Sequence, residues 1–225
     1  MHSPTFNLTF IHIPKTGGSS ITTQFSEPKR YMRYNIGHST MQEILKGRIV
    51  EDWGDVSDVH SNITNRVVNS YRFSIIRNPY DRIRSFYSFV MRQEREQWGL
   101  KKDFSFHDFI FNCRNDTSIS RELRLARAWW PQAKYITDFD KVKFMTSQEL
   151  IDIPWKNIGL VDEYIKFENL KTELPKFYQK IGFDYGGELF HKLKSSSEQI
   201  RFTPAIKQRI YEMYEVDFKL FGYRK

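Results

Sequence analysis

The chain has 225 residues, a formal net charge of +8 at pH 7, and 40% hydrophobic and 16% aromatic residues. This length supports one substantial core, and we expect a single domain over residues 1–225. No stretch reaches the length of a membrane span, and the one cysteine, Cys113, excludes an intrachain disulfide. The positive charge favours an anionic partner, but no helix-turn-helix, zinc or RNA-binding signature accompanies it, so we expect no nucleic-acid partner.

The first element along the chain is an apolar, strand-like run over residues 6–13. It leads into the loop PKTGGSS, residues 14–20, and then into an amphipathic segment. This order predicts a strand, a tight loop and a helix whose backbone N–H groups and dipole act on one point. Gly17 and Gly18 let the backbone approach a ligand closely, and Lys15 adds a positive charge. The loop therefore predicts a site for an anion, a phosphate or a sulfate ester.

This loop differs from the Walker loop G-x-x-x-x-G-K-[ST], because its lysine precedes the glycine pair. We also find no downstream strand aspartate of the kind that holds magnesium in an NTPase. Both observations argue against a P-loop small-molecule kinase, which stays open as an alternative. A plain strand–helix turn with a surface lysine is the simplest structural alternative.

Residues 39–46 predict a short helix capped by Ser39 or Thr40. Residues 71–76 predict a strand, and Asn78-Pro79 starts a long helix to about residue 96. Arg77 follows directly on the apolar strand, where a guanidinium is well placed to bind a phosphate with two donors. The next two arginines, Arg82 and Arg84, can instead be solvated residues on the surface of an amphipathic helix.

The rest of the chain continues this alternation. Residues 104–111 predict a helix on the core, residues 133–137 and 142–145 two short strands, and residues 158–167 a longer strand. Thr203-Pro204 is a good N-cap and first-turn pair for the final helix. The pattern predicts an α/β fold with a mostly parallel central sheet flanked by helices, and a site at the carboxyl ends of the strands.

Two segments resemble the sulfotransferase superfamily, whose members use 3′-phosphoadenosine 5′-phosphosulfate (PAPS). They are IHIPKTGGSS, residues 11–20, and the pattern R-N-P-x-x-R-x-x-S from Arg77 to Ser85. The first resembles the carbohydrate branch, which contains heparan 2-O-, chondroitin and dermatan sulfotransferases. The resemblance implies a P-loop-like PAPS-binding fold, PAP (3′,5′-ADP) as product and no metal. It implies cofactor binding by Lys15, Thr16, Gly17, Gly18, Ser19, Ser20, Arg77 and Ser85.

The resemblance extends more weakly over nearly the whole chain. Gly37-His38-Ser39-Thr40 resembles the G-H-x-[ST] segment of that branch, whose histidine is the proposed catalytic base. The late strand and Glu-Asn-Leu of residues 161–170 and the closing helix with its Phe-Gly-Tyr end are also similar. Residues 91–135, where acceptor-facing elements are expected, match no member. Glu168 either organises the site or is a carboxylate at a helix start.

The resemblance implies an O-sulfotransferase that moves a sulfuryl group from PAPS to a hydroxyl, with a saccharide or glycoconjugate as acceptor. Lys15 is then expected to stabilise the leaving phosphate and His38 to act as general base, with His60 in reserve and His12 as a packed strand residue. A non-catalytic polyanion-binding protein is the remaining alternative.

The segment before residue 6 shows no signal-peptide pattern, and we expect a soluble cytoplasmic protein of bacterial or viral origin. Cys113 is expected to be a small buried apolar residue. We expect the tryptophans Trp53, Trp98, Trp129 and Trp130 in the core rather than stacked on sugar rings.

Overall fold

The computed structural model describes residues 1–26, 36–51, 55–58, 61–93, 96–184 and 200–225. Its central sheet has the strand order β1-β2-β5-β6. The strands are β1 (His2–Ser3), β2 (Leu8–Ile11), β5 (Tyr71–Ile76) and β6 (Glu163–Lys166). β1 is antiparallel to β2, whereas β2 and β5, and β5 and β6, pair in parallel. The predicted fold class, a mostly parallel sheet in an α/β protein, is confirmed.

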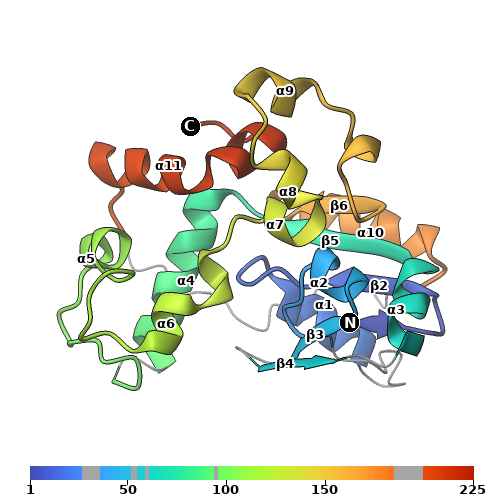
Figure 1. The fold of residues 1–225 in the computed structure, drawn as a ribbon, viewed down its shortest axis with the longest axis horizontal. Coiled ribbons are helices and arrows are strands. Elements are labelled where there is room, and N and C mark those ends of the chain that lie inside the picture. Colours follow the sequence, from blue (N-terminus) through green and yellow to red (C-terminus); the bar gives the residue numbers. More distant parts are fainter. Residues whose placement is uncertain (27–35, 52–54, 59–60, 94–95, 185–199) are drawn as a thin grey trace.

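Helices surround this sheet (Figure 1). They are α1 (Gly18–Ser26), α2 (Met41–Leu45), α3 (Ser61–Val68), α4 (Pro79–Gln93), α5 (Phe106–Phe111), α6 (Arg121–Leu125), α7 (Ala133–Ile136), α8 (Phe139–Val142), α9 (Ser147–Asp152), α10 (Leu170–Lys180) and α11 (Pro204–Leu220). Three 3₁₀ turns join them: η1 (Arg127–Trp129), η2 (Trp155–Asn157) and η3 (Phe167–Asn169). A separate antiparallel pair, β3 (Arg48–Glu51) and β4 (Asp55–Asp58), follows α2.

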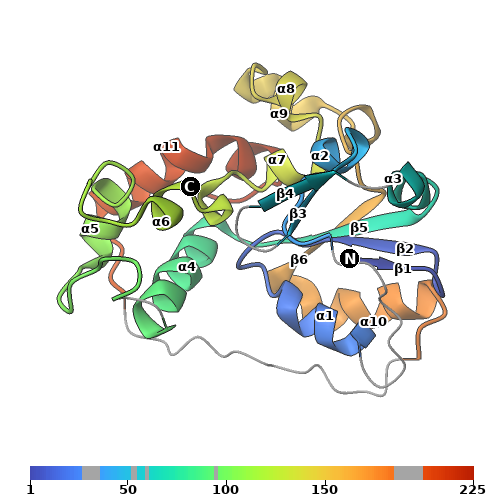
Figure 2. The same cartoon turned by 60° about the horizontal axis from the view of Figure 1, so that its bottom comes forward.

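Both faces of the central sheet are covered, because its strands carry apolar side chains on both sides. Figure 2 shows α1 and α10 together on one face, and α2, α3 and α7 beyond the other. On β2, Phe10 joins the cluster under α1 and α10, and Ile11 joins the cluster under α2 and α7. Ile75 and Ile76 of β5 divide in the same way. The alternation of side chains along each strand thus builds two core layers.

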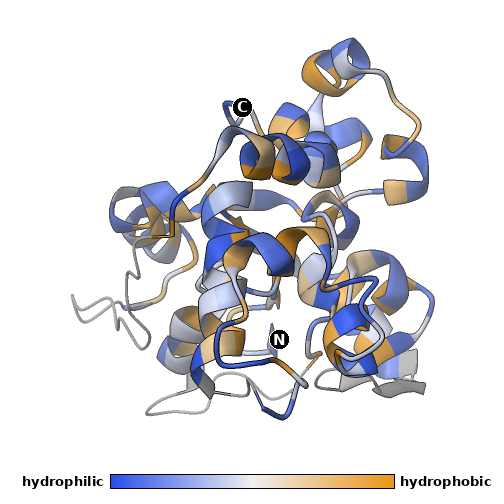
Figure 3. Ribbon diagram, turned by 90° about the vertical axis from the view of Figure 1, so that its left-hand side faces the viewer, coloured by the Kyte–Doolittle hydropathy of each residue, from blue (hydrophilic) through white to orange (hydrophobic). Residues whose placement is uncertain are grey.

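A third apolar cluster lies among α4, α5, α6 and α11. Its centre is aromatic: the Phe86 ring centroid lies 5.3 Å from that of Phe109 and 5.1 Å from that of Trp129. Figure 3 shows that hydrophobic (orange) and hydrophilic (blue) residues alternate along the helices. Trp98 is also buried here, so the expectation of core tryptophans is confirmed for Trp98 and Trp129. Trp130 is half-buried, and Trp53 lies outside the described residues. Cys113 is buried as predicted, and burial raises the pKa of its thiol to about 12.

Two predicted strands are wrong, because residues 133–137 and 142–145 lie largely in or beside α7 and α8. An apolar run of this length fits a strand or one helical turn equally well. Tertiary contacts decide here: the buried carboxylate of Asp217 accepts the Ala133 N–H at 2.9 Å and so caps α7. Thr137 retains only an isolated bridge to Gly159.

The predicted helix starts are more successful. Thr40, and not Ser39, caps α2 through a capping box with Glu43. Thr203 caps α11 with Pro204 in its first turn. Among the helices of the described residues, none is both long and apolar enough to cross a membrane.

Arg82 of α4 is buried inside the protein, so its interpretation as a solvated arginine is wrong. Its guanidinium donates to the carbonyl oxygens of Pro14 (3.1 Å), Ala128 (3.0 Å) and Trp130 (2.9 Å). The position is 2% exposed. Arg84, by contrast, is half-exposed and pairs with Asp81 one turn away. Arg82 therefore joins the β2–α1 loop to the segment around η1.

Replacing Arg82 by methionine keeps most of the apolar volume but leaves three carbonyl oxygens without their donors. We expect the free energy of unfolding to fall by about 3 kcal/mol. The matched variant Arg84→Met removes a half-exposed arginine from the same helix and should change it by less than about 0.5 kcal/mol. Chemical denaturation of the three proteins measures this, and equal losses in both variants would contradict the role of Arg82.

Candidate functional site

The loop between β2 and α1 is tightly folded. Lys15 and Gly17 both have positive φ, 68° and 89°. The Thr16 hydroxyl is buried and donates to the Ile13 carbonyl at 2.9 Å, and the Ser20 N–H donates to the Gly17 carbonyl at 3.1 Å. A lysine in this backbone region is strained, and such strain is typical of ligand-binding loops. The structure thus places the Thr16 side chain inside the loop.

The loop leaves backbone donors available. Among the described residues, no acceptor is found for the N–H groups of Thr16, Gly17, Gly18 and Ser19. These groups lie at or just before the start of α1, where the helix dipole adds positive potential. A bound anion satisfies donors of this kind. This observation fits the phosphosulfate end of the donor that the sequence implies.

Both glycines are required by the packing around the loop. A Cβ on Gly17 would lie 2.7 Å from the Phe167 ring, and a Cβ on Gly18 would lie 2.1 Å from the His12 ring. Neither distance is possible for a real side chain without movement. The loop is therefore held between an aromatic ring that follows β6 and a histidine ring on the residue after β2.

Arg77 follows β5 directly and reaches this same loop. Its Nη1 donates to the Lys15 carbonyl at 3.3 Å, and its guanidinium lies 4.3 Å from the centroid of the Phe167 ring. Its Nε is buried and has no hydrogen-bond partner among the described residues. The structure thus brings the two signature segments together at the carboxyl ends of β2 and β5.

Gln132, which the sequence did not single out, fixes the backbone of Arg77. Its side-chain amide accepts the Arg77 N–H at 2.7 Å and donates to the Arg77 carbonyl at 2.8 Å. The Gln132 N–H in turn donates to the carboxylate of Asp217 at 2.8 Å. Asp217 lies on α11, and burial raises the pKa of its carboxyl group. The C-terminal helix therefore supports the end of β5 through one amide.

Glu168 fixes the next residue of the same turn. Its carboxylate accepts the Asn78 N–H at 2.7 Å and the Tyr223 hydroxyl at 3.1 Å. Asn78 itself accepts the Tyr80 N–H at 2.9 Å and so starts α4. Of the two interpretations of Glu168, these contacts favour the one in which it organises the site.

Ser85 lies one turn beyond Arg82 on α4 and one turn before Phe89. Residues three and four apart share a helix face. Arg82 contacts the Pro14 carbonyl, and the Lys15 ammonium lies 4.0 Å from the centre of the Phe89 ring. The half-buried Ser85 therefore lies on the face of α4 that is turned toward the loop.

Positive charge accumulates at this point. Burial, followed by the charges of Arg92 and Arg77, lowers the pKa of Lys15 to about 8. Such a shift means that the charged lysine is disfavoured by its surroundings. An anion between these groups would remove that repulsion, so the electrostatics also fit a phosphate or sulfate ligand.

His38 contacts the strand that feeds the loop. Its Nδ1 lies 3.0 Å from the carbonyl oxygen of His12. A carbonyl only accepts, so Nδ1 carries the proton and Nε2 of the neutral ring carries a lone pair. Burial lowers the pKa of His38, and Arg127 contributes in the same direction. The ring is therefore neutral at pH 7 and can accept a proton.

Two other contacts relate to this histidine. Its ring centroid lies 4.5 Å from that of His12. The His12 ring packs against Gly18, in agreement with the prediction that His12 is a packed residue. Arg127 holds Glu43, the capping-box residue of the helix after His38, with two bonds of 2.8 Å. The reserve base, His60, lies outside the described residues.

The model of the sulfotransferase family matches residues 1–224. The chain belongs to the sulfotransferase family. A comparison with curated proteins found no match, so the assignment depends on the family model together with the site described above. Within the described part of the chain, no group of three or more histidine, cysteine, aspartate and glutamate side chains is placed to hold a metal ion.

The close contact at Gly17 predicts a graded response to alanine. Both Gly17 and Gly47 have positive φ, so alanine is strained at either position. At Gly17 the added Cβ also clashes with Phe167, whereas at Gly47, where φ is 73°, it enters open space. We expect Gly47→Ala to lower the free energy of unfolding by about 1 kcal/mol and Gly17→Ala by clearly more. Chemical denaturation compares the two variants, and equal losses would show that Phe167 does not confine the loop.

Proposed function

We propose that this sulfotransferase moves a sulfuryl group from PAPS to a hydroxyl group of a saccharide or glycoconjugate. The observation that carries the proposal is the contact between Arg77 and the carbonyl of Lys15. It brings the two segments that recognise opposite ends of PAPS in this family to one place. Fold likeness alone would not support a function, because function depends on the site.

The residues present fit the donor at both ends. Lys15 and the free N–H groups from Thr16 to Ser19 would hold the 5′-phosphosulfate. Arg77, whose Nε has no partner among the described residues, and Ser85 would hold the 3′-phosphate. Phe167 and Gln132 fix the plane and the backbone of Arg77 and so prepare it for this contact.

The bound donor supplies an activated sulfuryl group with a phosphate as leaving group. His38 accepts the hydroxyl proton at Nε2 while the new O–S bond forms and the S–O bond to the phosphate breaks. Lys15 and the loop N–H groups stabilise the negative charge that remains on the phosphate oxygen. Because these donors are held in place by the fold, they need little reorganisation during the reaction.

Ligand binding separates this proposal from a kinase and from a non-catalytic polyanion-binding protein. PAP at about 100 times its Kd should stabilise the protein by about 2.7 kcal/mol, seen as a higher melting temperature. ATP with magnesium should have no comparable effect. Arg77→Ala should abolish the PAP shift, while Arg209→Ala, a half-exposed arginine on α11, should keep it. A shift with ATP alone would overturn the proposal.

Transfer of radiolabelled sulfate from PAPS to a panel of glycans measures the catalytic roles. Lys15→Ala should lower kcat about 10²–10³-fold, because it removes charge stabilisation at the leaving group. His38→Ala should lower it about 10²–10⁴-fold, because it removes the base. Full activity in either variant would refute the role of that residue.

The pH dependence of kcat/KM should report both groups in the free enzyme. Activity should rise with pH as His38 loses its proton, with an apparent pKa below the usual 6.5 because burial lowers it. It should fall again near pH 8 as Lys15 loses its charge. Lys15→Arg should move this alkaline limb out of range, since arginine keeps its charge. An unchanged limb near pH 8 in that variant would exclude Lys15 as its source.

A further inference from the structure

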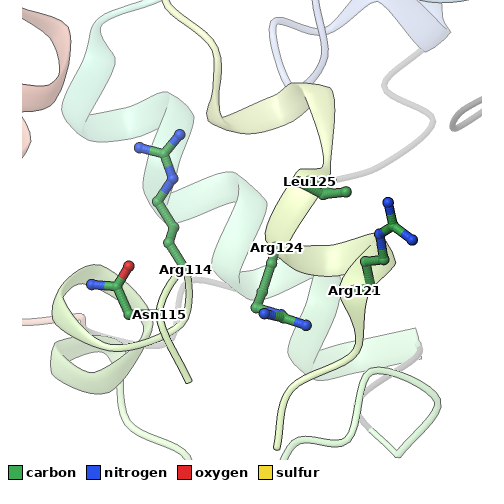
Figure 4. Close-up of a pocket in the computed structure, with 5 residues that line it drawn as sticks. All are labelled: Arg114, Asn115, Arg121, Arg124 and Leu125. Atoms are coloured by element: carbon green, nitrogen blue, oxygen red, sulfur yellow. The ribbon is translucent and has the colours of Figure 1, made fainter. Parts of the chain in front are cut away.

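A pocket of about 490 Å³ lies between the turn after α5 and the short helix α6. We call it the arginine pocket, and it is lined by Arg114, Asn115, Arg121, Arg124 and Leu125. Figure 4 shows Arg114 and Asn115 on one side and the three α6 residues on the other. This volume is within the usual range for small-molecule sites. None of its lining residues belongs to the site described above.

The charge in this pocket is not neutralised by direct pairing. Within the described part of the chain, none of its three arginines forms a salt bridge. The nearby carboxylate of Asp116 is used within its own turn, where it accepts the N–H and hydroxyl of Ser118 at 2.8 and 2.6 Å. The Nε of Arg124 is buried and has no partner among the described residues. The charges of Asp116 and Glu122 act on Arg121 and Arg124 from a distance, but in the described part of the chain no carboxylate pairs directly with the three guanidinium groups.

The lining residues specify the chemistry of that ligand. Guanidinium groups present fixed pairs of donors that match the oxygens of a carboxylate, sulfate or phosphate. Asn115 adds an amide, and Leu125, which is 62% exposed, adds an apolar surface beside the charges. This combination suits an anionic group carried on a larger, partly apolar framework such as a sugar ring.

The pocket is connected to the candidate active site through η1. α6 continues through a single residue into η1, where Arg127 holds Glu43 of the segment that carries His38. The guanidinium of Arg114 lies 5.6 Å from the centre of the Trp129 ring, also in η1. Both walls of the pocket thus adjoin η1, whose Arg127 binds Glu43, five residues after the proposed base His38.

We propose that the arginine pocket binds a carboxylate or sulfate group of the acceptor, at a distance from the reacting hydroxyl. The proposal rests on the proposed function, because only a sulfotransferase reaction makes the ligand an acceptor. Binding of the ligand can nevertheless be measured without turnover. The pocket selects acidic, extended saccharides over neutral ones. It also gives a role to part of residues 91–135, the stretch in which the sequence analysis found no resemblance to a family member.

Direct binding tests the proposal, with a fluorescent heparin octasaccharide as probe. Arg114→Ala/Arg121→Ala/Arg124→Ala should raise its Kd about tenfold or more. The control Lys156→Ala/Lys176→Ala/Lys207→Ala removes the same charge from exposed positions elsewhere and should change Kd less than about twofold. Replacing the three arginines by lysine should recover part of the affinity, because charge returns without paired donors.

Comparison with desulfated heparin distinguishes the two anion sources. If the arginine-to-alanine triple variant still binds desulfated heparin more weakly than the lysine-to-alanine control does, the pocket binds a carboxylate. If the two variants bind desulfated heparin equally well, the pocket binds a sulfate ester. The proposal would be overturned if both triple-alanine variants lost affinity for heparin equally, because binding would then reflect overall charge. It would also be overturned if neither variant lost affinity, because heparin would then bind another surface. The PAP melting shift is measured on the same proteins. If wild type lacks that shift, the proposed function fails, whereas the binding result still decides the pocket.

Discussion

The buried guanidinium of Arg82 is the contact on which the geometry of the site depends. Burying a guanidinium is costly unless its donors are satisfied. Here the three acceptors come from two separate pieces of chain, the β2–α1 loop at Pro14 and the η1 region at Ala128 and Trp130. All three of these hydrogen bonds form only when both pieces lie against α4. Local folding of the loop is thereby coupled to the packing of the helical layer.

Gln132 extends this coupling to the other half of the site. It follows Trp130 by two residues and holds both backbone groups of Arg77, while Asp217 of α11 holds Gln132. The two signature segments are therefore fixed by one short stretch, residues 128–133. The fold itself thus holds the loop and Arg77 in their relative positions through these contacts, and donors fixed in this way are the condition for electrostatic preorganisation. Burial, and after it the charges of Arg92 and Arg77, lowers the pKa of Lys15 at this point.

The sequence predicted the elements whose signals are local. Strand β5, the starts of α2 and α11 and the loop before α1 depend on capping residues, glycines and short apolar runs, and the structure confirms them. The resemblance predicted the family, which the family model confirms. It also predicted the candidate site residues, and their catalytic roles stay predictions. The nature of α7 was missed, because the contact that caps it comes from Asp217, far along the chain. The strand expected over residues 158–167 is shorter, since β6 covers Glu163–Lys166.

The supporting residues could not be found from sequence for the same reason. Gln132 and Phe167 have no recognisable pattern around them, and Arg82 looked like a surface position because its acceptors are backbone carbonyls of distant segments. A side chain that binds backbone leaves no partner residue type to search for. Only the structure shows that such residues help to hold the segments of Lys15 and Arg77 together.

The position of η1 adds a consequence for substrate choice. The Ala128 carbonyl of this turn accepts a hydrogen bond from Arg82, and its Arg127 binds Glu43. The turn follows α6, which forms one wall of the arginine pocket. A ligand group bound between Arg114 and Arg124 would therefore act on the element whose Arg127 binds Glu43, five residues after His38. Binding energy gained far from the reacting hydroxyl can in this way be used to orient the acceptor at the base. An acidic acceptor would then differ from a neutral one in kcat as well as in KM, because its remote charge contributes to alignment in the transition state.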